Sequence, residues 1–195
     1  MSLQPAAADA NGFRAALGSF AAGVNVITLR EADGAPLGMT ATAFSSVSTD
    51  PLLVLICVNR ANRSYERIAE TGRFGVNILG TAAREISDHC ARPGSDKTLA
   101  DEWLVERPEW HAPALAKALA FLDCEVEQDV AAGTHAVLIA RVRGIGAAED
   151  ERSGLAPLVH FRGAYRELVH TSAPTPRSHD AGRNSSSAHV VKEYA

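Results

Sequence analysis

Two segments of this sequence carry side chains suited to binding a ligand. The first lies between Thr40 and Thr49, where small and hydroxylated residues predominate and no charge occurs before Asp50. A strand of this composition leaves its backbone N–H and C=O groups unobstructed, and its hydroxyls can both donate and accept hydrogen bonds. The composition therefore favours contact with a flat ring, rich in heteroatoms, that lies close to the backbone.

The second segment, Asn59-Arg-Ala-Asn-Arg-Ser64, connects an apolar run to a predicted helix. Its amides, guanidinium groups and hydroxyl would lie where the first N–H groups of a helix lack partners and the helix dipole is positive, an arrangement that binds phosphate. A capped helix with exposed arginines would produce the same sequence. The adjacent hydroxyl-rich strand favours the first interpretation, and with it a ligand that carries both a ring and a phosphate.

A pair of glycines, Gly144-Ile-Gly146, resembles part of a dinucleotide-binding fingerprint. That fingerprint requires a strand, a tight turn and an apolar helix, whereas acidic residues 149–151 follow here. We therefore interpret the pair as the glycine-containing end of a strand. The sequence also contains no Gly-x-Ser-x-Gly nucleophile elbow, no P-loop and no His-Glu-x-x-His zinc motif.

Five further side chains have both a structural and a functional interpretation. His135 opens an apolar strand, where a hydrogen-bonded structural role and a catalytic role both remain open. His160 and Tyr165 flank the middle of the last predicted strand and could be ordinary barrel wall. Trp103 and Trp110 are most simply explained by packing in a lid or an interface.

Composition narrows the class of protein. The chain has 195 residues, enough for one substantial domain, with 46% hydrophobic and 22% charged residues. A net charge of −4 without a basic stripe argues against nucleic acid or an anionic membrane as the main partner. The longest apolar run, residues 52–58, is too short to span a bilayer, and the first residues lack the basic and apolar regions of a signal peptide.

The three cysteines, Cys57, Cys90 and Cys124, lack the spacing of metal ligands. Cys57 and Cys124 are expected to be buried and inert. The expected compartment is the cytoplasm.

Hydrophobic periodicity predicts more strands than helices. Strands are expected at residues 24–29, 37–44, 52–58, 73–79, 121–130, 134–145 and 158–168, with the 52–58 strand central because it is apolar on both faces. Short helices are expected at 11–22, at 64–70 with Ser64 as N-cap and Gly72 after its end, and at 81–90. Residues 92–113 are interpreted as a surface excursion. The pattern predicts a mainly β protein, a closed or nearly closed antiparallel β-barrel with short peripheral helices. A flexible leader at 1–10 and a flexible tail at 170–195 would flank one domain at 11–169.

Several motifs occur in one order between Phe13 and Leu168. They are Gly23-Val-Asn-Val-Ile-Thr28, Gly38-Met-Thr-Ala-Thr-Ala-Phe-Ser-Ser-Val-Ser48 with Asp50-Pro51, Val58-Asn59 with Ser64, Phe74-Gly-Val-Asn-Ile-Leu79, Leu122-Asp-Cys-Glu-Val126, Gly133-Thr-His135, and Pro157-Leu158 with Phe161-Arg-Gly-Ala-Tyr165. In this order and spacing, the chain resembles the flavin reductase family, FMN-binding split-barrel proteins that serve two-component flavin-dependent monooxygenases. The resemblance implies a closed antiparallel split β-barrel of Greek-key type with short flanking helices.

The resemblance implies a site in which the flavin ring lies along residues 39–43 and ring and ribityl along residues 46–48. The expected cofactor-binding residues are Met39, Thr40, Ala41, Thr42, Ala43, Ser46, Val47, Ser48, Val58, Asn59, Arg63, Ser64 and Tyr165. His135 matches the family histidine beside the nicotinamide, while Thr134 replaces the usual Asp and His89-Cys-Ala91 replaces a common Phe-Ala. No residue is expected to be essential as a catalytic acid or base, and no metal is expected.

The resemblance implies an NAD(P)H:flavin oxidoreductase. Such an enzyme would use NADH or NADPH to reduce FAD or FMN and would supply diffusible reduced flavin to a partner monooxygenase. A homodimer is expected, because cofactor sites favour subunit junctions. Two alternatives stay open: a non-catalytic flavin-binding or sensor protein on the same barrel, and a split-barrel oxidase that holds FMN tightly.

Overall fold

Seven strands form one antiparallel sheet in the computed structural model, which describes residues 3–5, 7–94, 96–105, 107–148 and 156–168. The sheet order is β3-β2-β6-β9-β10-β5-β4. The strands are β2 (Asn25–Arg30), β3 (Pro36–Ala41), β4 (Phe44–Thr49), β5 (Leu52–Asn59), β6 (Arg73–Leu79), β9 (Ala118–Ala132) and β10 (His135–Ala147). The mainly β prediction is confirmed. Within the described residues no ladder joins β3 to β4, so closure of the barrel stays a prediction.

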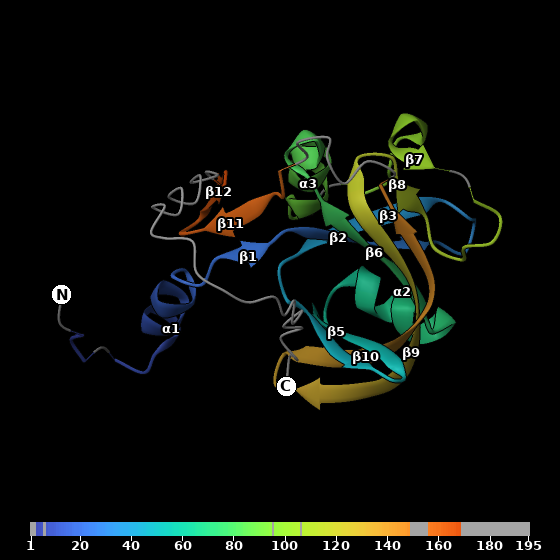
Figure 1. Ribbon diagram of the computed structural model, residues 1–195. Helices are drawn as coiled ribbons and strands as arrows, with labels where there is room; N and C mark the ends of the chain where they lie inside the picture. The colour runs from blue at the N-terminus through green and yellow to red at the C-terminus, as the bar shows by residue number, and fades with distance from the viewer. Residues whose placement is uncertain (1–2, 6, 95, 106, 149–155, 169–195) are drawn as a thin grey trace, which may run out of the picture.

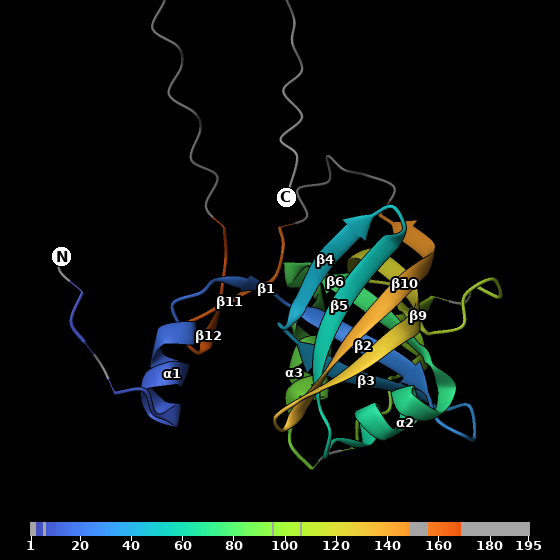
Figure 2. The ribbon, with the colours of Figure 1, turned by 90° about the horizontal axis from the view of Figure 1, so that it is seen from below.

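The sheet curls around one apolar core, with β5 and β10 on one side and β2 and β3 on the other (Figures 1 and 2). Ile27, Ile56, Phe74 and Leu138 are among the fully buried side chains. Because side chains alternate along a strand, each strand contributes one face to this core. The predicted central position of the 52–58 strand is wrong: β5 is second from an edge, and only alternate residues are buried.

The helices differ from the prediction at their starts and ends. Helix α2 (Arg63–Thr71) has Asn62, not Ser64, as its N-cap, and it ends at Gly72 with φ 66° as expected. Helix α3 (Arg84–Ala91) follows the 3-10 turn η1 (Thr81–Ala83). Helix α1 (Ala10–Leu17) ends at Leu17, five residues before the predicted end at residue 22, and it buries none of its residues.

Two small sheets lie beside the main sheet. Strand β1 (Ala22–Gly23) pairs with β11 (Val159–Phe161), which forms a hairpin with β12 (Ala164–Arg166). The single strand predicted at 158–168 is therefore a hairpin, turned by Arg162 and Gly163 with φ 50° and 74°. The predicted surface excursion contains the 3-10 turn η2 (Asp101–Trp103) and β7 (Leu104–Val105), which pairs with β8 (Ala114–Leu115). The predicted tail at 170–195 lies outside the described residues.

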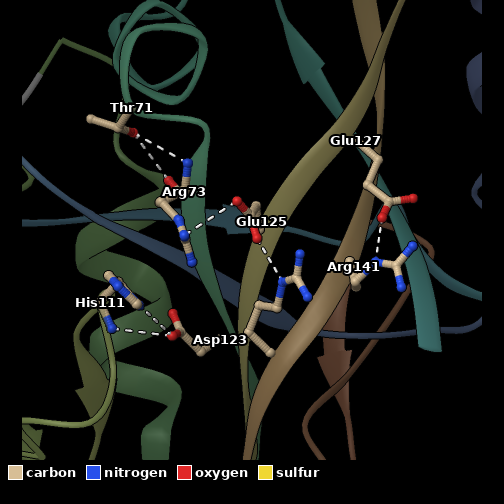
Figure 3. A network of polar contacts seen from close by, with 8 residues as sticks. Thr71, Arg73, His111, Asp123, Glu125, Glu127 and Arg141 are labelled. Carbon is tan, nitrogen blue, oxygen red and sulfur yellow. Dashed lines mark hydrogen bonds and ion pairs between the residues drawn. The ribbon is translucent and has the colours of Figure 1, made fainter. Parts of the chain in front are cut away.

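Hydrogen bonds to buried polar side chains of the sheet hold the predicted surface excursion against it. Asp123 of β9 is 2% exposed and accepts hydrogen bonds from both the backbone N–H and the Nδ1 of His111, each 3.1 Å, and from Ala112 N at 3.2 Å. Figure 3 shows His111 facing Asp123, with Arg73 and Glu125 forming a neighbouring ion pair. Asn77 accepts from Leu115 N at 2.8 Å. A buried acceptor without donors is costly, so these bonds fix where the excursion runs.

The glycine pair of the false fingerprint belongs to β10, as the sequence predicted. A Cβ on Gly146 would lie 2.6 Å from the Trp110 ring and one on Gly144 would lie 3.0 Å from it. The ring in turn lies 4.6 Å, centroid to centroid, from that of Phe121. These glycines therefore make room for a tryptophan rather than for a dinucleotide.

The three cysteines are unpaired. Burial raises the pKa of the Cys90 and Cys124 thiols to about 12, which confirms that Cys124 is an inert thiol. Cys57 is only half-buried, so its predicted burial is wrong. In the described part of the chain, the helices all fall short of the length and apolar character needed to cross a membrane.

Gly38 lets β3 approach α3 and the segment at residues 97–99. Its N–H donates to the Lys97 carbonyl at 3.0 Å, and an added Cβ would lie 2.5 Å from Cys90 Sγ and 3.0 Å from Leu99 Cδ2. Because these neighbours are buried, they cannot move aside freely. The close approach builds one wall of the cleft described below.

We predict that Gly38→Ala lowers the free energy of unfolding by about 1–3 kcal/mol, because it overpacks a dense contact. Gly23→Ala is the matched control, since its added Cβ meets no atom within 4 Å, and it should change stability by less than about 0.5 kcal/mol. Thermal or urea unfolding measures both. Equal stability of the two variants would contradict this packing argument.

Candidate functional site

The pairing of β5 with β10 sets His135 directly opposite Asn59. The two-residue turn before His135 requires Gly133, with φ 61°, and the Thr134 carbonyl accepts from Arg60 N at 3.0 Å. His135 is exposed, and its Nδ1 lies 2.9 Å from Thr134 Oγ1. The predicted nicotinamide-side histidine therefore lies beside the predicted phosphate-binding segment, from which it is distant in sequence.

At the start of α2, the residue that caps the helix is not the residue whose hydroxyl is available to a ligand. Asn62 Oδ1 accepts from Ser64 N at 3.0 Å, and Asn59 Oδ1 accepts from Ala61 N at 3.0 Å. Ser64 is 4% exposed, and its hydroxyl has no hydrogen-bond partner within the described residues. Asn62 is therefore occupied with the helix cap, whereas the Ser64 hydroxyl is available to a ligand.

An open cleft of about 680 Å³ borders this helix start. Its other walls are the turn between β2 and β3 and the segment at residues 91–98. Arg63 lines the cleft and forms an ion pair with Glu31, Nε to Oε1 2.9 Å. Lys97 also lines it, a residue that sequence reasoning missed because residues 92–113 have no periodicity. The cleft thus offers a helix N-terminus, a free hydroxyl and two cations to an anionic group.

The hydroxyl-rich segment bends at Thr42 and Ala43 between β3 and β4, and both residues are exposed. The Ala43 carbonyl accepts from Cys57 N at 3.2 Å, which holds the bend against β5. Strand β4 is an edge strand with a bulge between Ser46 and Ser48. An edge strand leaves N–H and C=O groups free for a ring to bind.

Not all predicted residues can present their side chains to a ligand. Met39 is 7% exposed and Val58 is 1% exposed, and both belong to the core. These two residues can contact a ligand only through their backbone. Ala41 packs partly against the same core, whereas Ser46 and Val47 are exposed on β4 and Ser48 is half-buried.

Thr40 and Tyr165 meet through Ser87 of α3. Thr40 Oγ1 donates to the Ser87 carbonyl at 2.7 Å, and the Tyr165 hydroxyl lies 2.8 Å from Ser87 Oγ. Burial raises the pKa of Tyr165, so its hydroxyl is neutral at physiological pH. Both hydroxyls are thus occupied in joining β3, α3 and β12. Their geometry supports a structural contribution to the site.

The candidate site thus has three features: the backbone groups of the β4 edge, a cleft suited to an anion at the start of α2, and an exposed histidine opposite Asn59. Among the described residues no group of three or more His, Cys, Asp and Glu side chains could hold a metal ion. Residues 17–169 match the family described as a flavin reductase like domain. The chain belongs to the flavin reductase family.

Several known proteins are similar to this chain. The probable flavin reductase of Rhizobium meliloti is 37% identical over 157 residues, covering 80% of this chain and 48% of that protein. The reductase component of the flavin-dependent trigonelline monooxygenase of Acinetobacter baylyi is 38% identical over 152 residues, covering 78% of this chain and 47% of that protein. The chain spans about half the length of these two relatives. Among solved structures, the chain is similar to the NADH:FAD oxidoreductase SgcE6 of Streptomyces globisporus in complex with NAD and FAD fragments. The TM-score is 0.74 and the identity 28%, and the match covers 83% of this chain and 93% of that chain.

We predict that Ser64→Ala and Asn62→Ala separate flavin binding from helix capping. Ser64→Ala should weaken FMN binding about tenfold or more, because a hydrogen bond to a charged group contributes roughly 1.5–3 kcal/mol. Asn62→Ala should instead lower the free energy of unfolding by about 1 kcal/mol, the usual loss for a helix cap. Fluorescence titration and thermal unfolding measure the two effects. A Ser64→Ala variant that binds FMN normally but melts early would contradict the assignment.

Proposed function

We propose that this protein is an NAD(P)H:flavin oxidoreductase that reduces FMN or FAD and releases reduced flavin to a partner monooxygenase. The observation that carries the proposal is the β5–β10 register, which sets His135 opposite Asn59, a residue that lines the cleft at the start of α2. The chain's similarity to a monooxygenase reductase component and to an NADH:FAD oxidoreductase supports the proposal. The domain that we assign to this activity is residues 11–169.

We propose that the flavin phosphate binds at Ser64 and the helix start, with the ring along the bend and β4. In the register, Phe44 lies opposite Ile56 and Ser48 opposite Leu53, so β4 runs away from Asn59. A ligand anchored at Ser64 would therefore reach Thr42 and Ala43 before it reaches residues 46–48. This order favours contact of residues 46–48 with the ring rather than with the ribityl chain.

The residues fit a reaction that needs orientation more than acid–base chemistry. Bound flavin and NAD(P)H would themselves supply the chemistry, a hydride transfer from nicotinamide to flavin, and the protein would hold the two rings in place. The edge backbone of β4 would hold the polar rim of the ring, and the exposed His135 would hydrogen-bond the carboxamide or ribose of NAD(P)H. Fixing two rings in contact is itself a large contribution to rate.

Steady-state oxidation of NADH and NADPH with free FMN and free FAD tests the proposal. We expect turnover that depends on added flavin, together with flavin binding weak enough for release. Flavin binding without nicotinamide oxidation would instead indicate the non-catalytic binding protein. Flavin that stays bound through purification and turnover would indicate the oxidase.

We predict that His135→Ala raises the KM for NADH or slows flavin reduction by about three- to tenfold, the loss expected for one neutral hydrogen bond. Flavin affinity should be nearly unchanged, because His135 lies on the nicotinamide side. His135→Asn, which keeps a donor, is the conservative control and should recover part of the loss. Stopped-flow reduction of bound flavin measures both steps. Normal reduction and NADH affinity with poor flavin binding would contradict this role.

We propose that the curled sheet closes as a split barrel at the bend between β3 and β4. We also propose that the chain is a homodimer and that it is cytoplasmic. Two apolar surfaces support the dimer. On α1 and after it, Phe13, Leu17 and Phe20 are 63%, 55% and 73% exposed. On the outer face of β5 and β10 lie apolar, half-buried side chains, namely Leu53, Leu55, Cys57, Val137 and Ile139. An eight-residue helix is not stable alone, so α1 requires a packing partner. The unpaired cysteines fit a reducing compartment.

We predict a mass of twice the 20.6 kDa chain by light scattering at micromolar concentration. Phe13→Asp should shift the population toward monomer, because it places a charge in the apolar surface. Leu3→Asp, at a fully exposed position before α1, is the matched control and should leave the mass unchanged. A monomeric wild-type protein would contradict the dimer.

A further inference from the structure

Arg63, the predicted phosphate ligand, already has an anionic partner. Its Nε lies 2.9 Å from Glu31 Oε1, at the end of β2. The Arg63 side chain is 73% exposed, whereas that of Glu31 is 13% exposed. The pair therefore joins an exposed cation to a largely buried anion.

Burial makes Glu31 depend on this partner. Its Oε1 atom is buried, and apart from the ion-pair contact with Arg63 it has no hydrogen-bond partner within the described residues. Neither water nor other hydrogen-bond donors compensate the negative charge of Glu31 well. A buried charge that loses its partner is strongly unfavourable. Glu31 consequently holds Arg63 more firmly than an exposed carboxylate would.

The other carboxylates of the cleft are engaged differently. Asp33 Oδ1 accepts from Ala35 N at 3.0 Å, and Asp96 Oδ1 accepts from Thr98 N and Oγ1 at 2.9 and 2.6 Å. The Thr98 hydrogen bonds, with smaller contributions from His89 and Arg63, hold the pKa of Asp96 below its usual value. Among the described residues that line the cleft, Glu31 is the carboxylate that forms an ion pair with one of its cations.

We propose that Glu31 competes with the flavin phosphate for Arg63 and thereby weakens the hold on flavin. This inference rests on the proposed function. A phosphate that reaches the start of α2 must share Arg63 with Glu31, and the two anions then lie close together in a partly buried site. Their repulsion raises the free energy of the bound flavin. A reductase that passes reduced flavin to another protein needs such release.

Glu31→Gln tests the competition, because it removes the charge and keeps the shape. We expect it to tighten FMN binding about three- to tenfold while riboflavin, which has no phosphate, changes by less than about twofold. Asp33→Asn removes the same charge from the same cleft and should change FMN affinity by less than about twofold. Fluorescence titration measures each dissociation constant. Glu31→Ala serves as a second variant if Glu31→Gln does not fold.

The double variant separates competition for Arg63 from a general charge effect. In an Arg63→Gln background, Glu31→Gln should no longer change FMN affinity by more than about twofold. In turnover, Glu31→Gln should lower the KM for FMN, and kcat should fall where release limits the rate. Equal tightening by Glu31→Gln and Asp33→Asn, tightening of riboflavin, or persistence of the effect without Arg63 would overturn the proposal. Wild-type protein that binds neither FMN nor FAD would instead refute the proposed function itself.

Discussion

The site depends on the register between β5 and β10. The Gly133-Thr134 turn fixes where β10 begins, and the ladder then places His135 opposite Asn59. A slip of one residue would move His135 to the other face of the sheet, because side chains alternate with period two. The register is secured by the buried face of both strands, where Ile56 and Leu138 lie opposite each other in the core.

A second constraint shapes the cleft. Gly38 allows Cys90 and Leu99 to pack directly on β3, so α3 and the following segment form a wall facing the start of α2. Polar anchors at Ser87 and Asp123 fix α3 and the excursion against the sheet without using the groups that face the cleft. The core thus fixes the walls of the cleft. The cationic side chains of the cleft lie on its exposed side, where Arg63 forms an ion pair with Glu31.

Periodicity alone predicted most strands because their buried faces are continuous, as in residues 73–79, which form β6 as expected. It failed at the start of α2, where two residues that often cap helices, Asn62 and Ser64, lie two positions apart and the structure has Asn62 as the N-cap. It also failed at residues 158–168, where Arg162 adopts a positive φ that its residue type does not signal. The Glu31–Arg63 pair joins residues 32 positions apart, and only tertiary packing brings them together.

Hydrogen–deuterium exchange with and without saturating FMN tests the central claim, that the flavin lies between the start of α2 and the edge of β4. The account predicts slower exchange at residues 42–48 and 59–64, with the protection at residues 133–135 increasing when a nonreactive NADH analogue is added. Protection confined to the excursion at residues 92–113, or to α1, with residues 42–48 and 59–64 unchanged, would contradict it.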